Sequence, residues 1–136
     1  MTGLVLPLGP RRLYLRSSPI HGIGVFAAAE CRLGALLEVS PVLVVCPKHV
    51  PALQPTSLYR YFFSWPPAAV ALALGYGSLY NHSYQPTARF KMDIEQGVIV
   101  FTAIQPICQN QEITINYNGD PEDLTPVRLD WPDPRR

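Results

Sequence analysis

The chain has 136 residues, a formal net charge of +1, 48% hydrophobic side chains and 15% charged side chains. These values are typical of one globular domain with a modest core, and they exclude a disordered chain. The near-neutral charge gives no electrostatic case for a nucleic acid as a bulk partner. Fifteen prolines and nine glycines disfavour a helical bundle, because proline interrupts helix interiors. We therefore expect a mostly β fold with short helices.

The first ten residues are apolar, but prolines and a glycine interrupt them and no charged segment precedes them. This stretch is too short for a signal peptide or a membrane span, so we expect that the protein does not associate with a membrane. The three cysteines lie far apart without a CxxC pair, and Cys46 with His49 supplies only half of a zinc-ligand spacing. We therefore expect no disulfide and no metal site. A cytoplasmic location, or a nuclear one in a eukaryote, follows as the default.

The first half of the chain contains short extended segments separated by proline-rich turns. Residues 13–16 predict a strand that ends at a Ser-Ser-Pro turn. Residues 35–46 are rich in Leu and Val, and Pro41 makes them two strands or one kinked edge strand, because proline cannot donate to a ladder. Residues 47–55 predict a loop. The aromatic run 59–65 is expected in the core and not as a binding platform.

The second half predicts strands more clearly. Residues 68–74 are rich in alanine, which favours helix, but the run is short and lies between Pro-Pro and glycine. We expect a buried strand there. Residues 88–94 and 98–103 alternate between apolar and polar side chains, and Glu95-Gln96-Gly97 between them predicts a hairpin. Residues 112–117 alternate again, before a tail that holds half of the acidic residues.

A polar stretch, residues 77–86, follows the apolar run directly. It is bounded by two turn signals and contains five neighbouring side chains that can form hydrogen bonds: Tyr80, Asn81, His82, Ser83 and Tyr84. Such a cluster at the end of a buried element either satisfies buried backbone groups or holds a ligand. The sequence of this stretch alone does not decide between these two roles.

A glycine-rich motif, Gly22-Ile23-Gly24-Val25-Phe26-Ala27, matches the spacing of the dinucleotide fingerprint. Glycines at this spacing let backbone amides approach a ligand closely. A dinucleotide site requires a strand before the motif, a helix after it and continued βαβ alternation. Residues 25–37 pass as a weak helix, but prolines, a hairpin and short strands replace the alternation downstream. A nucleotide-binding oxidoreductase is therefore the weaker alternative.

Three stretches taken together give a more specific indication: Gly22-x-Gly24-Val25-Phe26-Ala27, then Asn81-His82-Ser83-x-x-Pro86, then Glu112-Ile113-Thr114-x-x-Tyr117. In this order and at these separations they resemble the SET domain of protein-lysine methyltransferases. The resemblance covers roughly residues 13–117, with 1–12 as an N-terminal extension and 118–136 as a C-terminal tail. It implies a SET β-fold, with small sheets around a pseudoknot where the Asn81-His82-Ser83 and Tyr117 segments meet.

The resemblance also implies S-adenosylmethionine as cofactor and assigns roles to individual residues. Tyr117 matches the catalytic tyrosine, and Tyr80 is the second catalytic candidate. The cofactor would be bound by the glycine-rich motif, by the Asn81 side chain and largely by the backbone of His82; the implied cofactor-binding residues are Gly22, Ile23, Gly24, Val25, Asn81 and His82. Glu112 is expected to order the segment that carries Tyr117, not to act as a general base.

Methyl transfer needs a neutral lysine amine, and an ordinary lysine pKa near 10.4 makes deprotonation costly at neutral pH. An apolar aromatic channel lowers that pKa by desolvation. The expected wall residues are Tyr76, Tyr80, Tyr84 and Phe101. The tail, anchored by Trp131, would complete the channel, although a second copy of the chain is another candidate for closing it. The acidic residues of the tail suit a basic protein or peptide as substrate.

Simpler structural roles remain open for single residues. Tyr117 can anchor a strand end through a bonded hydroxyl, and Asn81 and Ser83 can cap a turn. Thr87 stands where members of this family commonly have Asn, and the sequence leaves open whether this change reduces the order of the turn or the affinity for the cofactor. A different class of function also remains, namely a catalytically inactive SET-like module that binds basic peptides.

Overall fold

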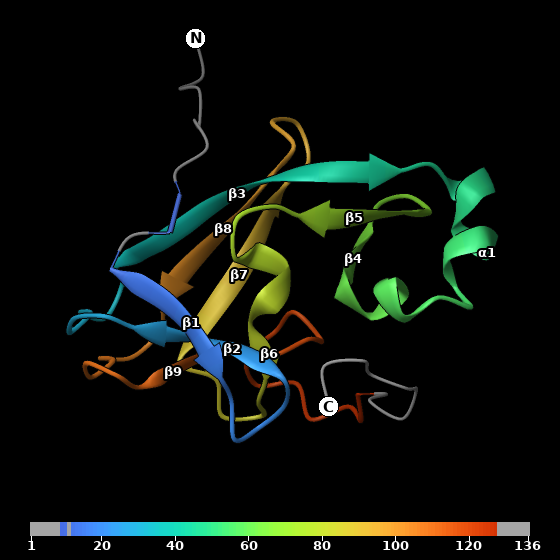
Figure 1. The fold of residues 1–136 in the computed structure, drawn as a ribbon. Coiled ribbons are helices and arrows are strands. Elements are labelled where there is room, and N and C mark those ends of the chain that lie inside the picture. The colour runs from blue at the N-terminus through green and yellow to red at the C-terminus, as the bar shows by residue number, and fades with distance from the viewer. Residues whose placement is uncertain (1–8, 11, 128–136) are drawn as a thin grey trace, which may run out of the picture.

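The computed structural model describes residues 9–10 and 12–127, and its strands form two small sheets (Figure 1). The four-stranded sheet has the order β1-β2-β9-β6, and the five-stranded sheet has the order β4-β5-β3-β8-β7. Val25 and Ile113 of the first sheet and Ile99 and Phe101 of the second belong to one buried core cluster. The mostly β fold expected from the composition is confirmed. No helix among the described residues is long and apolar enough to cross a membrane.

The four-stranded sheet brings the three motif segments together. Its first three strands pair antiparallel, whereas β6 and β9 pair in parallel, with Asn81 opposite Thr114 and His82 opposite Ile115. Parallel pairing of segments so far apart in sequence places the polar stretch beside the end of β9, at the crossing where the pseudoknot is expected. The strands are β1 (Leu13–Ser17), β2 (Ile23–Ala27), β9 (Glu112–Ile115) and β6 (Asn81–His82).

The five-stranded sheet is built around one long strand, β3, which changes partner at Pro41. Up to Pro41 it pairs with β8, and from Val42 onward it pairs with β5. The change of partner explains how one continuous strand tolerates a proline, which has no N–H for a ladder. The strands are β3 (Leu36–Val45), β4 (Phe62–Trp65), β5 (Ala69–Ala73), β7 (Ala88–Asp93) and β8 (Val98–Ala103).

Two expectations about this sheet are confirmed. The alanine-rich run forms β5, because β3 and β4 pair with it on both sides and this pairing outweighs the helix propensity of alanine. The β7–β8 hairpin also forms: the Gly97 amide donates to the Asp93 carbonyl at 2.9 Å, and Gly97 has a φ of +66°. That positive φ suits glycine and explains its place in the turn.

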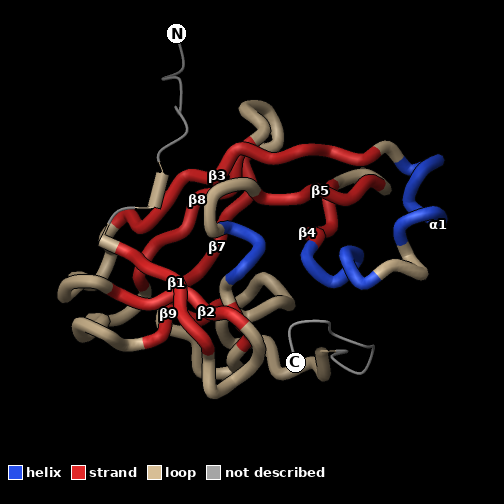
Figure 2. The backbone as a smooth tube through the Cα atoms, viewed as in Figure 1, coloured by secondary structure: helices blue, strands red, loops and turns tan. Residues whose placement is uncertain are grey.

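The prediction of a loop over 47–55 is wrong, because short helices form there. Pro47 and Pro51 occupy the first turns of η1 and α1, where a missing N–H breaks no helical hydrogen bond. Figure 2 shows these helices together at one end of the molecule, between β3 and β4. The helical elements are η1 (Pro47–His49), α1 (Val50–Leu53), η2 (Ser57–Tyr61) and η3 (Gly77–Leu79).

Candidate active site

The glycine-rich motif begins at a closed turn and continues as strand β2. Gly22 has a φ of +48°, and its carbonyl accepts the Ser18 amide at 2.7 Å. A side chain at Gly24 would collide with the Glu112 carboxylate, so this glycine allows Glu112 to lie against β2. Because the motif itself forms strand β2 and the next element of the chain is strand β3 and not a helix, the dinucleotide-binding alternative is wrong. Residues 25–37, considered as a weak helix in that alternative, contain most of β2 and the start of β3.

Glu112 and Asn81 join the three motifs through one hydrogen-bond network. The Glu112 carboxylate accepts the Ser18 hydroxyl at 2.7 Å and the Asn81 amide nitrogen at 2.9 Å. The same Asn81 nitrogen donates to the His21 carbonyl at 2.9 Å. Glu112 therefore orders the turn before Gly22 and the Asn81 side chain. This differs from the expectation that Glu112 orders the segment carrying Tyr117.

Tyr117 is held at both ends. Its backbone amide donates to Nδ1 of His82 at 3.0 Å, and its hydroxyl donates to the Tyr80 carbonyl at 2.7 Å. The His82 ring also packs against two tyrosine rings, with its centroid 4.4 Å from that of Tyr84 and 5.1 Å from that of Tyr117. His82 thus contributes its side chain, and not only its backbone, to the geometry of Tyr117.

The His82 imidazole is uncharged in this arrangement. Burial lowers its pKa below the ordinary value of 6.5, since a buried charge loses hydration. Nδ1 accepts the Tyr117 amide, so the ring proton is assigned to Nε2. Nε2 is buried and has no hydrogen-bond partner among the described residues.

Thr87 stabilises the turn in which it lies. Its hydroxyl accepts the Thr114 amide at 3.1 Å, and its own amide donates to the Thr114 hydroxyl at 3.3 Å. Both side chains are buried. Threonine thus ties the end of the polar stretch to β9 with a reciprocal pair of hydrogen bonds.

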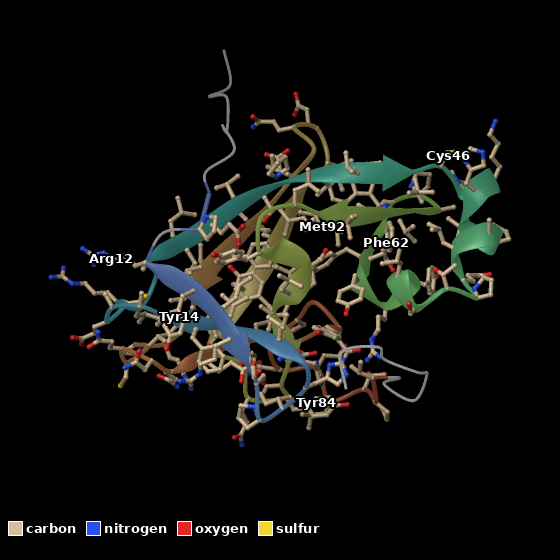
Figure 3. All side chains as sticks on the ribbon, in the orientation of Figure 1. Arg12, Tyr14, Cys46, Phe62, Tyr84 and Met92 are labelled. Carbon is tan, nitrogen blue, oxygen red and sulfur yellow. The ribbon has the colours of Figure 1, made fainter. Side chains whose placement is uncertain are left out.

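A cavity of about 500 Å³ opens beside Tyr117. Residues 59–64 and the β7 residues Phe90 and Met92 line one part of it, and Asn118, Gly119, Pro126 and Val127 line another. Figure 3 shows Phe62 and Met92 in neighbouring parts of the structure. The aromatic residues that line the cavity are Tyr59, Tyr61, Phe62, Phe63, Tyr80, Phe90 and Tyr117.

This lining differs from the expected channel walls. Phe101 is fully buried in the core and stacks on Tyr80 at 4.5 Å. Tyr76 and Tyr84 also lie outside the lining. The Tyr84 hydroxyl instead accepts the Val127 amide at 3.0 Å, close to the C-terminal segment (Figure 3). Trp131 falls outside the described residues.

Sequence reasoning missed the aromatic run 59–65 as part of the site. Only Trp65 in this run is buried, and Phe63 packs against the core. Tyr59, Tyr61 and Phe62 keep partial exposure and line the cavity. The available signal was the density of five aromatic side chains over seven residues, which exceeds what one side of a short strand can bury.

Tyr80 takes a different place from the one expected of a catalytic hydroxyl. Its side chain is 1% exposed, and its hydroxyl donates to Oε1 of Glu38 at 2.8 Å. Burial and the adjacent Glu38 raise the pKa of this hydroxyl well above its ordinary value. In the structure Tyr80 offers its carbonyl to Tyr117, while its own hydroxyl bonds to Glu38 in the interior.

The C-terminal segment 118–127 closes one side of the cavity. The side-chain amide of Asn116 donates to the Asp123 carbonyl at 2.7 Å, and the side-chain amide of Asn118 donates to the Thr125 carbonyl at 2.8 Å. These bonds hold Pro126 and Val127 at the lining. Among the described residues, no group of three or more His, Cys, Asp or Glu side chains could hold a metal.

Comparisons with known proteins agree with this architecture. The sequence matches the family model described as SET domain over residues 22–118. It is 32% identical over 116 residues to a histone-lysine N-methyltransferase of Schizosaccharomyces pombe named as specific for H3 lysine 37, which covers 85% of this chain and 78% of the relative. A crystal structure of a Plasmodium falciparum protein described as a candidate histone methyltransferase aligns with a TM-score of 0.67. That alignment has 29% identity and covers 79% of this chain and 93% of the other.

The chain therefore belongs to the SET-domain family. Its fold is the mostly β fold of that family, and its activity is that of a protein-lysine methyltransferase.

Proposed function

We propose that the chain transfers a methyl group from S-adenosylmethionine to the side-chain amine of a lysine in a basic protein. The observation that carries the proposal is the position of Tyr117: it is held at both ends and lines an aromatic cavity of about 500 Å³. Cofactor and substrate sites in proteins commonly have volumes of about 300–1,000 Å³.

The residues at the site fit this cofactor. Both hydrogens of the Asn81 amide are used within the protein, which leaves its oxygen to accept from the amino group of the methionine moiety. His82 provides a buried Nε2 donor with no acceptor among the described residues, and the adenine and carboxylate groups of the cofactor carry acceptors. When bound, S-adenosylmethionine supplies an electrophilic methyl group on its sulfonium.

The aromatic lining prepares the lysine for attack. Deprotonating an ordinary lysine at pH 7 costs about 4–5 kcal/mol, given a pKa near 10.4. Rings such as Tyr59, Phe62 and Phe90 at the cavity replace water around the amine, and desolvation disfavours its charged form. Exclusion of water also protects the aligned reactants.

Tyr117 orients the amine. Because its hydroxyl proton is donated to the Tyr80 carbonyl, the oxygen presents its lone pairs as acceptors for the N–H groups of a neutral lysine. Holding the N–H groups directs the amine lone pair, and such alignment is the main contribution a protein makes to an in-line transfer. No general base is assigned to this step; the lysine loses its proton on entering the site.

The acidic residues of the C-terminal segment support a basic substrate. Asp120, Glu122 and Asp123 lie in the segment between two lining stretches, and Asp120 and Glu122 are exposed. Carboxylates in this segment favour a basic peptide through charge complementarity. The relative from Schizosaccharomyces pombe is named for a histone lysine, and histone tails are basic peptides of this kind.

Transfer of tritium from labelled S-adenosylmethionine to a mixture of core histones and other basic proteins tests the proposal. We expect incorporation by the wild-type chain and a loss of at least about 100-fold in Tyr117→Phe, because the variant lacks the acceptor oxygen. Calorimetric titration with S-adenosylhomocysteine measures cofactor binding independently. Binding of the cofactor without any transfer would favour the inactive module that engages basic peptides.

A further inference from the structure

A buried carboxylate lies behind the site, on β3. Glu38 is only 1% exposed, and its two oxygens bond to different parts of the turn that precedes Asn81. Oε1 accepts the Tyr80 hydroxyl at 2.8 Å, and Oε2 accepts the Tyr76 amide at 2.8 Å. One side chain therefore holds both ends of the segment 76–80, which contains η3.

The segment is shaped to lie directly on β3. Gly75 has a φ of +66°, and a side chain there would collide with Oε2 of Glu38. A Cβ at Gly77 would lie 2.5 Å from the Ser40 hydroxyl and 2.6 Å from the Ala73 Cβ. These distances are well inside ordinary van der Waals contact. Glycines at both positions allow the backbone to approach Glu38 and Ser40.

This anchored segment connects with Tyr117 through the Tyr80 carbonyl. That carbonyl accepts the Tyr117 hydroxyl at 2.7 Å, while the Tyr80 ring stacks on Phe101 and its own hydroxyl is bonded to Glu38. A shift of Tyr80 would move the acceptor and, with it, the Tyr117 hydroxyl. The path from Glu38 to Tyr117 consists of two hydrogen bonds and one rigid residue.

We propose that Glu38 is a positioning residue for methyl transfer, which sets the place of the Tyr117 hydroxyl by fixing Tyr80; this rests on the function proposed for Tyr117. A purely stabilising role is a poor account of this residue. Burial raises the pKa of the Glu38 carboxyl despite the hydrogen bonds from Tyr76 and Tyr80, which lower it. The charged form is thus disfavoured in the interior, where a neutral side chain would be less costly.

Glu38→Gln tests the proposal with little change in volume. The amide oxygen can keep the Tyr76 bond, but the NH₂ group can only donate, so the buried Tyr80 hydroxyl loses the acceptor of its proton and must turn that proton away from residue 38. We expect kcat to fall at least about tenfold, because misplacement of a reacting group slows transfer. The KM values for cofactor and peptide should stay within about twofold of wild type, because neither ligand contacts Glu38 in this proposal.

Two further variants separate positioning from stability. Tyr80→Phe removes the same hydrogen bond from the other side, so combining it with Glu38→Gln should reduce kcat little more than either change alone. Ile107→Val trims a core residue that is 0% exposed and lies outside the site. It should lower the melting temperature without lowering kcat.

A nuclear magnetic resonance measurement gives a readout that needs no turnover. In protein with ¹³C-labelled tyrosine rings, the Tyr117 signal is identified by its loss in Tyr117→Phe, and we expect it to shift in Glu38→Gln. The proposal is overturned if the Tyr117 signal and kcat of Glu38→Gln stay as in wild type. It is also overturned if Ile107→Val, at an equal loss of melting temperature, loses as much kcat as Glu38→Gln, because the effect would then come from stability alone. If the wild-type chain transfers no methyl group, the proposed function fails, while the Tyr117 signal still decides the role of Glu38.

Discussion

The hydrogen bond between the Tyr117 amide and His82 can be tested with two matched substitutions. His82→Phe keeps a ring packed against Tyr84 and Tyr117, whose centroids lie 4.4 Å and 5.1 Å from that of the imidazole, but it removes the Nδ1 acceptor. His82→Asn loses the ring and places an amide oxygen close to the position of Nδ1. If the acceptor positions Tyr117, activity should follow the acceptor and not the ring.

The size of each effect follows from the geometry. An intramolecular hydrogen bond such as this one, at 3.0 Å, contributes about 0.5–1.5 kcal/mol to stability. For a domain of this size that loss corresponds to roughly 2–6 °C in melting temperature. The kinetic effect should be larger, because a displacement of about 1 Å in a reacting group can cost about 100-fold. We expect His82→Phe to lose about 10–100-fold in kcat and His82→Asn to lose less than tenfold.

The same bond predicts a pH dependence. A protonated imidazole carries hydrogen on both nitrogens and cannot accept the Tyr117 amide. Burial lowers the pKa of His82 below 6.5, so its contribution to stability is fully present above pH 6.5 and is lost as the pH falls through the lower, folded-state pKa. Wild-type kcat should decline over the same range, and His82→Asn should lack this decline.

Methyl transfer measured between pH 5 and 9, with thermal melts of each variant at the same pH values, provides the data. The reasoning is refuted if His82→Phe transfers methyl groups as fast as wild type while His82→Asn is impaired. It is also refuted if His82→Asn retains the acid decline, since the titrating group would then be a different residue.

Two further predictions concern the framework of the site. Thr87→Val should destabilise the fold by about 1–3 kcal/mol in urea unfolding, because the buried Thr114 amide loses its acceptor; the control Thr87→Ser keeps the hydroxyl, and equal loss in both variants would contradict this explanation. Gly77→Ala should cost about 1–3 kcal/mol in melts, because its Cβ would lie 2.5 Å from the Ser40 hydroxyl. In Gly97→Ala nothing lies within 4 Å of the added Cβ, but φ is +66°, so that variant measures a left-handed backbone penalty that Gly77 does not carry. A Gly77→Ala variant as stable as wild type would exclude the steric overlap.

The strands with a clear alternating pattern could be predicted from the sequence. The hairpin of β7 and β8 and the strands β1 and β9 follow from local periodicity and turn residues, and these are properties of neighbouring residues. The short helices at 47–53 were not predicted, because prolines signal interruption in a sequence but are compatible with a first helical turn. That distinction depends on which residue begins the helix.

The motif residues were also identified correctly as neighbours. Parallel pairing of β6 with β9 and the bonds between Glu112, Asn81 and Ser18 bring the three stretches together. Their individual roles could not be derived from order and spacing, because a hydrogen bond depends on which atoms face each other. Glu112 thus bonds to Ser18 and Asn81, and His82 uses its side chain to hold the Tyr117 amide.

By itself, the sequence determined a mostly β domain, its principal strands and the family to which it belongs, since these depend on local patterns and on the order of motifs. Only the tertiary structure decided which aromatic residues line the cavity and which fill the core. Phe101 and Phe62 both lie in apolar, strand-like stretches of the sequence. In the structure Phe101 is fully buried in the interior strand β8, whereas Phe62 lines the cavity from the edge strand β4. The physical reason is that burial depends on the position of a strand within its sheet and on the elements that cover it, and both are set by contacts between residues far apart in the chain.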